Sequence, residues 1–205
     1  IRSAHMIGFS MGSLYMLRFL SLFPNRVANC IVISPGGLTE QMPKLIHRIG
    51  SRVCSVMSRN LFSATDVRKL LNDCVYEKEI VDDHMVRQYY QPLQDGLSRE
   101  ALMYALVNFD RDMVAEALLP IDHEVLVLWG KEDRWHPPSG SVYFQGVLQA
   151  GRYYLIRHAG HLLQEEAPGK LLEIIFSYIP PAVPSYNAYR YTQHAPMADN
   201  NWIRE

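Results

Sequence analysis

The sequence has almost no excess charge of either sign. Its 205 residues carry 20 Lys and Arg against 21 Asp and Glu, giving a formal net charge of −1 and a pI near 6.8. Because this balance provides no basic field, we expect no nucleic-acid partner. Long apolar runs are also missing. Arg18 and Lys170 interrupt or border the longest candidates, so we expect no membrane span.

Cysteine is scarce as well. The three cysteines, Cys30, Cys54 and Cys74, do not have the spacing of a metal site. We expect them to be small buried residues in a reducing compartment, which favours the cytoplasm. No pair or triple of His, Cys, Asp or Glu has metal-ligand spacing either. The sequence therefore predicts neither a metal nor another cofactor.

One stretch near the start organises the rest of the chain. Gly8-Phe9-Ser10-Met11-Gly12 lies between an apolar run that predicts a strand and a periodic run that predicts a helix. In that context G-x-S-x-G is typical of a nucleophile elbow. A serine alone at such a tight turn needs strained backbone, and we expect both glycines to be required by crowding. The alternative is an ordinary glycine-flanked turn with a capping serine.

The order of elements predicts an α/β fold with a parallel sheet. A strand ends at Ile7, a helix covers 11–23 and stops at Pro24, and a strand rich in β-branched residues covers 27–34. Further strands are expected at 125–129 and 153–157, and a helix opens at Pro168. With 48% apolar residues, the chain is long enough for one domain with a sizeable core.

Between the second and third of these strands the pattern predicts only helices. We expect them at 43–57, from Ser63 with Asp66 as its capping partner, at 79–91 ending near Pro92, and after Ser98. Such a helical insertion is expected over the carboxyl ends of the strands, adding no strand to the sheet. After Pro180-Pro181 the composition becomes polar with scattered aromatic residues, which predicts either a poorly ordered tail or one that packs through its aromatic side chains.

Three post-strand turns carry Ser10, Asp133 and His161, in that chain order. The carboxyl ends of parallel strands meet at one edge of a sheet, so these side chains can come together there. A serine that transfers acyl groups needs a base to take its proton and an acid to orient that base.

Each of the three assignments has local rivals. Asp133 fits a plain turn aspartate, and its neighbour Glu132 is expected to face solvent. His136 and His158 are the alternative histidines for the base. We expect His136 to compete with Asp133 for space and His158 to be a turn residue.

Four motifs, in order and at ordinary spacings, resemble the capped branch of the α/β-hydrolase superfamily over residues 1 to about 180. They are Gly8 to Gly12, Phe23 to Val27, Leu126 to Asp133 with Pro137, and Gly160-His161 with Glu165 and Pro168. The resemblance implies that Ser10 is the nucleophile, Asp133 the orienting acid and His161 the general base, with the Met11 amide as one oxyanion donor. It also implies a core of residues 1–37 and 120–180, a helical cap of residues 38–119 and a tail of residues 181–205.

The chain departs from that family in two ways. Ser13 stands where a second glycine is common, and its small side chain should still allow close helix packing. The chain also begins at Ile1 inside an expected strand, whereas family members have about four strands and a helix before the elbow, including the second oxyanion donor. We therefore expect the 205 residues alone to aggregate or to need the missing half in trans, and to show no esterase activity above background.

The expected activity is cleavage of an ester or related acyl bond through an acyl-serine intermediate, on a small apolar substrate. One alternative is hydrolysis of a carbon–carbon bond in a ring-cleavage product, because Ser34-Pro35-Gly36-Gly37-Leu38 is similar to the corresponding stretch of those hydrolases. A second alternative is a non-catalytic or inactive truncated member of the family.

Overall fold

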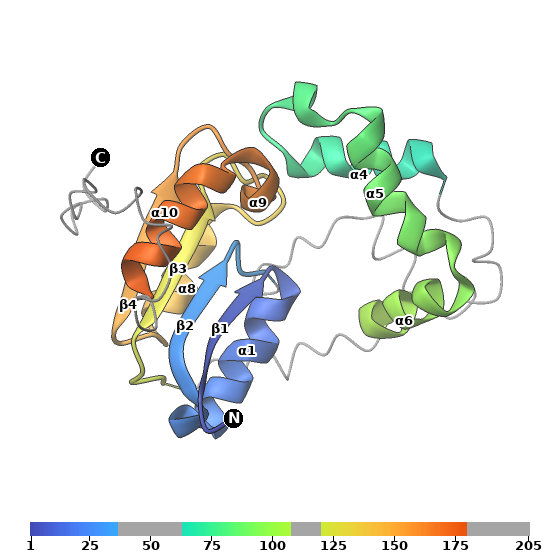
Figure 1. Cartoon of the computed structure of the whole chain (residues 1–205). Coiled ribbons are helices and arrows are strands. Elements are labelled where there is room, and N and C mark those ends of the chain that lie inside the picture. Colours follow the sequence, from blue (N-terminus) through green and yellow to red (C-terminus); the bar gives the residue numbers. More distant parts are fainter. Residues whose placement is uncertain (37–62, 108–119, 180–205) are drawn as a thin grey trace, which may run out of the picture.

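A single parallel sheet forms the centre of the molecule. The computed structural model describes residues 1–36, 63–107 and 120–179 (Figure 1). The strands follow one another across the sheet in chain order, and each neighbouring pair is parallel: β1 (Ala4–Phe9), β2 (Val27–Ile33), β3 (Val125–Gly130) and β4 (Gly151–Ile156). The α/β class with a mostly parallel sheet is thus confirmed.

The two inner strands are buried on both faces, as their unbroken apolar sequences predict. Every residue of β3 is buried, as are the last four of β2. In the described part of the chain β1 lies at one edge of the sheet, and its exposed and half-buried residues alternate before the buried Gly8.

Helices cover both faces of the sheet. On one face α1 (Met11–Leu22) and the short α8 (Ser141–Gln145) contribute Leu14, Leu17, Leu20 and Phe144 to a common core. On the other, α9 (Leu163–Glu166) and α10 (Pro168–Tyr178) contribute Leu163, Leu171, Ile174 and Ile175. Two short 3₁₀ helices, Pro24–Arg26 and Pro138–Gly140, lie in the connections. The helix expected to open at Pro168 is confirmed.

A separate group of helices lies beyond the carboxyl ends of the strands, at the upper right of Figure 1. It consists of α4 (Ala64–Cys74), a 3₁₀ turn (Lys78–Ile80), α5 (Asp83–Gln94) and α6 (Gly96–Val107). Within residues 63–107 no segment adds a strand to the sheet. The helix expected at 43–57 and the tail from 181 fall outside the described residues.

The start of α4 follows the predicted capping pattern. The Asp66 amide donates to the Ser63 hydroxyl at 3.2 Å, and the Ser63 amide donates back to the Asp66 carboxylate at 3.1 Å. This reciprocal pair satisfies two helix N-terminal donors. Ser63 followed three residues later by Asp66 was therefore a valid helix-start signal.

The expected boundaries of α5 and α6 are wrong. The third helix begins at Asp83 rather than 79, because the Asp82 carboxylate accepts from the Met85 amide at 2.7 Å. It continues through Pro92 to Gln94, where the Arg99 guanidinium binds the Leu93 and Gln94 carbonyls at 2.7 and 3.0 Å. Those bonds satisfy carbonyls that a helix end leaves free.

The fourth helix begins before Ser98, not after it. Asp95 accepts from the Ser98 amide at 2.7 Å, and α6 starts at Gly96. None of the helices in the three described ranges is long and apolar enough to cross a membrane.

Candidate active site

Ser10 occupies a strained turn between β1 and α1. Its φ of 50° lies in the left-handed region that side chains avoid. The Ser10 amide donates to the Ile33 carbonyl at 2.9 Å, so β2 holds the turn in place. Although Ser10 precedes α1, its side chain makes no capping hydrogen bond to the helix. The hydroxyl is thus available to a partner outside the turn.

The two elbow glycines are not equivalent. A Cβ at Gly8 would lie 2.8 Å from the Ser13 Cα and 2.9 Å from the Gly12 carbonyl oxygen, so only glycine fits. A Cβ at Gly12 would meet no described residue within 4 Å. The expectation that crowding requires both glycines is therefore wrong for Gly12, because that position faces outward from the first turn of α1.

Ser13 packs α1 closely against the strands. Its side chain is fully buried, and the hydroxyl donates to the Gly8 carbonyl at 2.9 Å. The small side chain thus allows close approach of helix and sheet, as expected.

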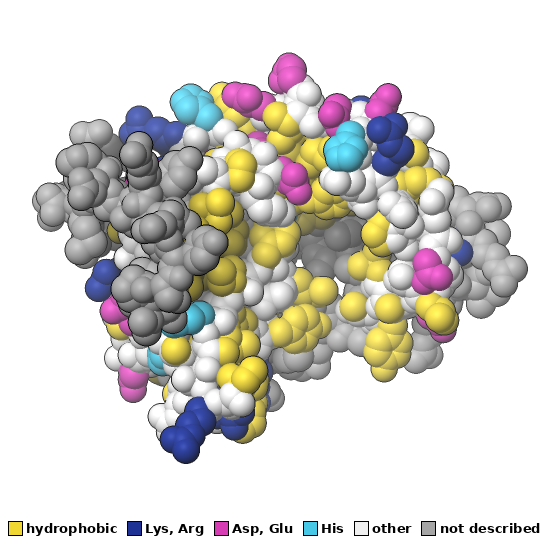
Figure 2. Space-filling model, in the orientation of Figure 1, with side chains coloured by type: hydrophobic (Ala, Val, Ile, Leu, Met, Phe, Trp, Pro, Cys, Tyr) yellow, Lys and Arg dark blue, Asp and Glu magenta, His cyan; other side chains and the backbone are white. Residues whose placement is uncertain are grey.

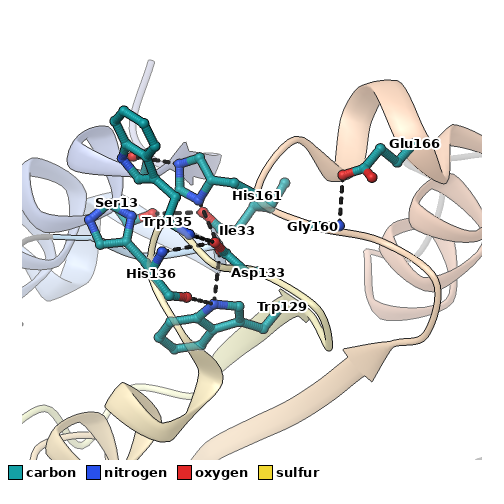
Figure 3. A network of polar contacts seen from close by, with 10 residues as sticks. Ser13, Ile33, Trp129, Asp133, Trp135, His136, Gly160, His161 and Glu166 are labelled. Carbon is teal, nitrogen blue, oxygen red and sulfur yellow. Dashed lines mark hydrogen bonds and ion pairs between the residues drawn. The ribbon is translucent and has the colours of Figure 1, made fainter. Parts of the chain in front are cut away.

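The structure places the His161 side chain between those of Ser10 and Asp133, within hydrogen-bond distance of both. His161 Nε2 lies 3.0 Å from Ser10 Oγ, and His161 Nδ1 lies 2.9 Å from an Asp133 carboxylate oxygen. Asp133 and His161 are each only 3% exposed. Figure 3 shows the His161 ring directed at the Asp133 carboxylate. With the Nδ1 proton donated to Asp133, Nε2 is free to accept the serine proton.

The Asp133 carboxylate is fixed by three further donors. The amides of Trp135 and His136 donate to one carboxylate oxygen at 2.9 and 2.8 Å, and the Trp129 indole donates to the other at 3.2 Å (Figure 3). The two amide bonds are an Asx-turn pattern, which aspartate in a turn favours. Sequence reasoning missed Trp129, whose signal is weak because tryptophan in a buried strand is more often packing.

Two of the rival residues, His158 and Glu132, make contacts of another kind. His158 is exposed, has a φ of 58° and packs against Tyr76 with ring centroids 5.8 Å apart. Glu132 was expected to face solvent, which is wrong. It is half-buried, and its carboxylate accepts from the Ala159 amide at 3.2 Å.

His136 lies beside His161 with ring centroids 5.0 Å apart. Burial, followed by the nearby His161, lowers the pKa of His136 to about 4. Its Nδ1 is buried and has no hydrogen-bond partner among the described residues. The ring covers Gly36, where a Cβ would lie 2.7 Å from it. His136 does not displace Asp133, because its backbone amide binds the carboxylate while its ring turns away toward Gly36.

Helix α1 begins at Met11, directly after Ser10. The first amides of a helix have no partner within the helix, and the helix dipole is positive at this end. The Met11 amide is thus placed to stabilise negative charge that forms beside Ser10.

Among the described residues no group of three or more His, Cys, Asp or Glu could hold a metal ion. Cys30 and Cys74 are free and buried, as expected of small core residues, and Cys54 lies outside the described ranges.

Several known proteins have sequences similar to this chain. An uncharacterised hydrolase of Bacillus subtilis, YugF, is 26% identical over 180 residues, which cover 87% of this chain and 66% of the relative. A 2-hydroxy-6-oxononadienedioate/2-hydroxy-6-oxononatrienedioate hydrolase of Comamonas testosteroni is 22% identical over 169 residues, covering 81% and 59%. The chain thus spans roughly three-fifths to two-thirds of the length of these relatives.

The fold is shared with solved structures. The 2-hydroxy-6-oxo-6-phenylhexa-2,4-dienoate hydrolase of Rhodococcus sp. strain RHA1 superimposes with a TM-score of 0.70 at 20% identity, covering 87% of this chain and 64% of that one. The family model described as the alpha/beta hydrolase fold matches residues 1–168. Since that match covers most of the chain, the chain belongs to the alpha/beta hydrolase family.

Proposed function

We propose that this protein is a serine hydrolase that cleaves an ester or related acyl bond. The observation that supports this most strongly is the continuous contact from Ser10 Oγ through the His161 ring to the Asp133 carboxylate, at 3.0 and 2.9 Å. Both distances lie within hydrogen-bond reach, as activation of a serine requires.

In the proposed reaction Ser10 Oγ attacks the substrate carbonyl while its proton moves to His161 Nε2. The tetrahedral oxyanion that results accepts a hydrogen bond from the Met11 amide. The Asp133 carboxylate stabilises the imidazolium form of His161. His161 then gives the proton to the departing alcohol oxygen as the carbon–oxygen bond breaks. A water molecule, deprotonated by His161, then attacks the acyl carbon. The bond from that carbon to Ser10 Oγ breaks as His161 returns the proton to Oγ, which releases the acid.

The surroundings of the site favour an apolar substrate. Figure 2 shows hydrophobic side chains bordering a hollow between the sheet and the helices α4 to α6. Half-buried aromatic residues in this region include Phe9 at the end of β1, Tyr89 and Tyr90 of α5, and Trp135 in the loop after β3. Phe9 and Trp135 lie against the His161 ring, with centroids 5.1 and 6.3 Å away. An apolar group next to the reacting carbonyl would contact these rings.

A second candidate is hydrolysis of a carbon–carbon bond. It is favoured by the Comamonas relative, which acts on a product with a 2-hydroxy-6-oxo dienoate pattern. In that reaction the leaving group is a carbon, so a proton must reach that carbon before the bond can break. The same three residues serve both reactions, and the substrate decides between them.

The test is a substrate panel for the full-length protein and its Ser10→Ala variant. Medium-chain acyl esters and 2-hydroxy-6-oxo dienoates are assayed side by side. Ser10-dependent turnover of the esters supports the first proposal, and a preference of more than about tenfold in kcat/KM for the dienoates supports the second. A protein with no Ser10-dependent turnover of either class would be a non-catalytic family member.

A further inference from the structure

Glu166 joins the loop that carries His161 to the helical group. One oxygen of its carboxylate accepts from the Gly160 amide at 2.7 Å, and the other accepts from the Tyr76 amide at 2.5 Å. Gly160 directly precedes His161, whereas Tyr76 follows α4 and is 90 positions away from Glu166. Figure 3 shows the Glu166 carboxylate directed at the Gly160 amide.

The two segments that Glu166 joins are in direct backbone contact. The His161 amide donates to the Cys74 carbonyl at 2.7 Å. A Cβ at Gly160 would lie 2.5 Å from that carbonyl oxygen and 3.0 Å from the Tyr76 nitrogen. The end of α4 therefore fixes where the backbone of His161 can lie, and glycine is required for the approach.

Side chains on both sides reinforce this contact. Leu162, directly after His161, is 5% exposed and packs in one cluster with Val67 and Leu71 of α4 and Met85 of α5. Tyr89 of α5 donates to the Glu165 carboxylate at 2.9 Å. The loop that carries His161 is thus held to the helical group by its backbone, by Leu162 and by Glu165.

We propose that Glu166 is a positioning residue for the general base: by binding the Gly160 and Tyr76 amides together, it sets the place of His161 between Ser10 and Asp133. This inference rests on the proposed hydrolase function. The His161 side chain has only two rotatable bonds, so a shift of its backbone moves Nε2 directly. A misplacement of about 1 Å at a reacting group can lower a rate by about a hundredfold.

A general contribution to folding does not explain this carboxylate. Burial is the largest influence on Glu166 and raises its pKa, while the amides of Tyr76, Gly160 and Glu77 and the Lys78 ammonium act in the opposite direction. The ionised form is therefore disfavoured overall in the folded protein. A glutamine that keeps the bond to the part-buried Gly160 amide should cost little stability, because the bond to the Tyr76 amide is exposed and water can replace its acceptor.

Glu166→Gln tests the assignment in the full-length protein, with Glu165→Gln as the matched control. A glutamine has one carbonyl oxygen, so it can accept from one of the two amides and turns its own NH₂ toward the other. We expect kcat of Glu166→Gln to fall by about ten- to a hundredfold, with KM and the midpoint of thermal unfolding nearly unchanged. Glu165→Gln keeps an amide oxygen that can accept from the Tyr89 hydroxyl, and it should keep the wild-type kcat.

A second readout does not depend on turnover. The proton shared by His161 Nδ1 and Asp133 should give a downfield NMR resonance, identified by its loss in Asp133→Asn. We expect Glu166→Gln to shift or broaden this resonance and Glu165→Gln to leave it unchanged. If Glu166→Gln unfolds, Glu166→Asp keeps the charge but is too short to reach both amides, and should show the same two effects.

Wild-type kcat and an unchanged resonance in Glu166→Gln would overturn the inference. A loss of activity that matches the loss of titratable active sites would also overturn it, because that pattern reports misfolding. If the wild-type protein shows no Ser10-dependent turnover, the proposed function fails, and the resonance alone decides whether Glu166 positions His161.

Discussion

His161 Nε2 lies 3.0 Å from Ser10 Oγ although 151 positions separate the two residues. The parallel sheet makes this possible. Ser10 follows β1 and the His161 loop follows β4, and both strands end at the same edge of the sheet. Since β1 and β4 lie at opposite ends of the described strand order, the histidine loop must reach back across the carboxyl ends of β2 and β3. The end of α4, bonded to the His161 amide, supports it there.

Asp133→Asn should remove most of the activity while preserving the fold. The asparagine oxygen can accept from some of the same donors, but its NH₂ cannot accept the His161 Nδ1 proton, so the wrong tautomer is favoured. We expect kcat to fall by about 10⁴-fold. Glu132→Gln is the matched control, because the Glu132 carboxylate accepts from the Ala159 amide and a glutamine oxygen can do the same. A kcat within tenfold of wild type would remove Asp133 from the proposed triad.

Asp133→Ala should in addition destabilise the protein. The part-buried amides of Trp135 and His136 would lose an acceptor, whereas the Trp129 indole keeps its bond to the His136 carbonyl at 2.7 Å. A buried unpaired donor costs about 1–3 kcal/mol, so denaturant unfolding should show a loss of a few kcal/mol relative to Asp133→Asn. Equal midpoints of denaturant unfolding for Asp133→Ala and Asp133→Asn would mean that water replaces the carboxylate as the acceptor.

Gly8→Ala and Gly12→Ala should have opposite effects on stability. The first places a methyl group 2.8 Å from the Ser13 Cα, where only backbone could move aside. We expect it to cost about 1–3 kcal/mol. The second meets no described residue and replaces glycine in a helix, which stabilises by about 0.5–1 kcal/mol. Chemical denaturation of both variants checks this, and equal losses would contradict the geometry.

His136 should make the protein less stable toward acid. Its folded pKa of about 4 lies below the ordinary value of 6.5. Between those values the unfolded state binds a proton that the folded state does not, so the free energy of unfolding falls as pH drops through this window. The effect is at most about 3 kcal/mol.

The check is the pH dependence of unfolding for His136→Leu between pH 7 and pH 4. This variant should lose part of the acid sensitivity, whereas His84→Leu, which changes an exposed histidine, should keep it. An unchanged slope in His136→Leu would place the acid sensitivity on other groups.

The sheet and its covering helices could be predicted from local sequence. Short β-branched runs such as Val27–Ile33 and the caps at Ser63 and Pro168 are signals that act within a few residues. The end of α5 could not be predicted in this way. Its carbonyls are satisfied by Arg99, a side chain from the next helix, which let the helix continue past Pro92.

From the sequence, the candidate site could be predicted only through the residues that directly follow the ends of strands. The rule that parallel strands end together selected Ser10, Asp133 and His161, and the structure brings them into contact. The residues that hold them were not predictable. Glu166 binds an amide 90 positions away, and no local pattern reports such a contact. The sequence motif had directed attention to Glu165 instead, which binds Tyr89.

We propose that Ser10 is a nucleophile and that His161 activates it. The most direct measurement is covalent labelling of the full-length protein with an activated alkyl phosphonate, followed by mass spectrometry of the digested protein. Ser34→Ala is the matched control, because Ser34 is buried at the end of the neighbouring strand and its hydroxyl has no hydrogen-bond partner in the described part of the chain. We predict one phosphonate on the peptide that carries Ser10 in the wild type and in Ser34→Ala, and none in Ser10→Ala. Undiminished labelling of Ser10→Ala, or labelling of another serine in the wild type, would contradict the account.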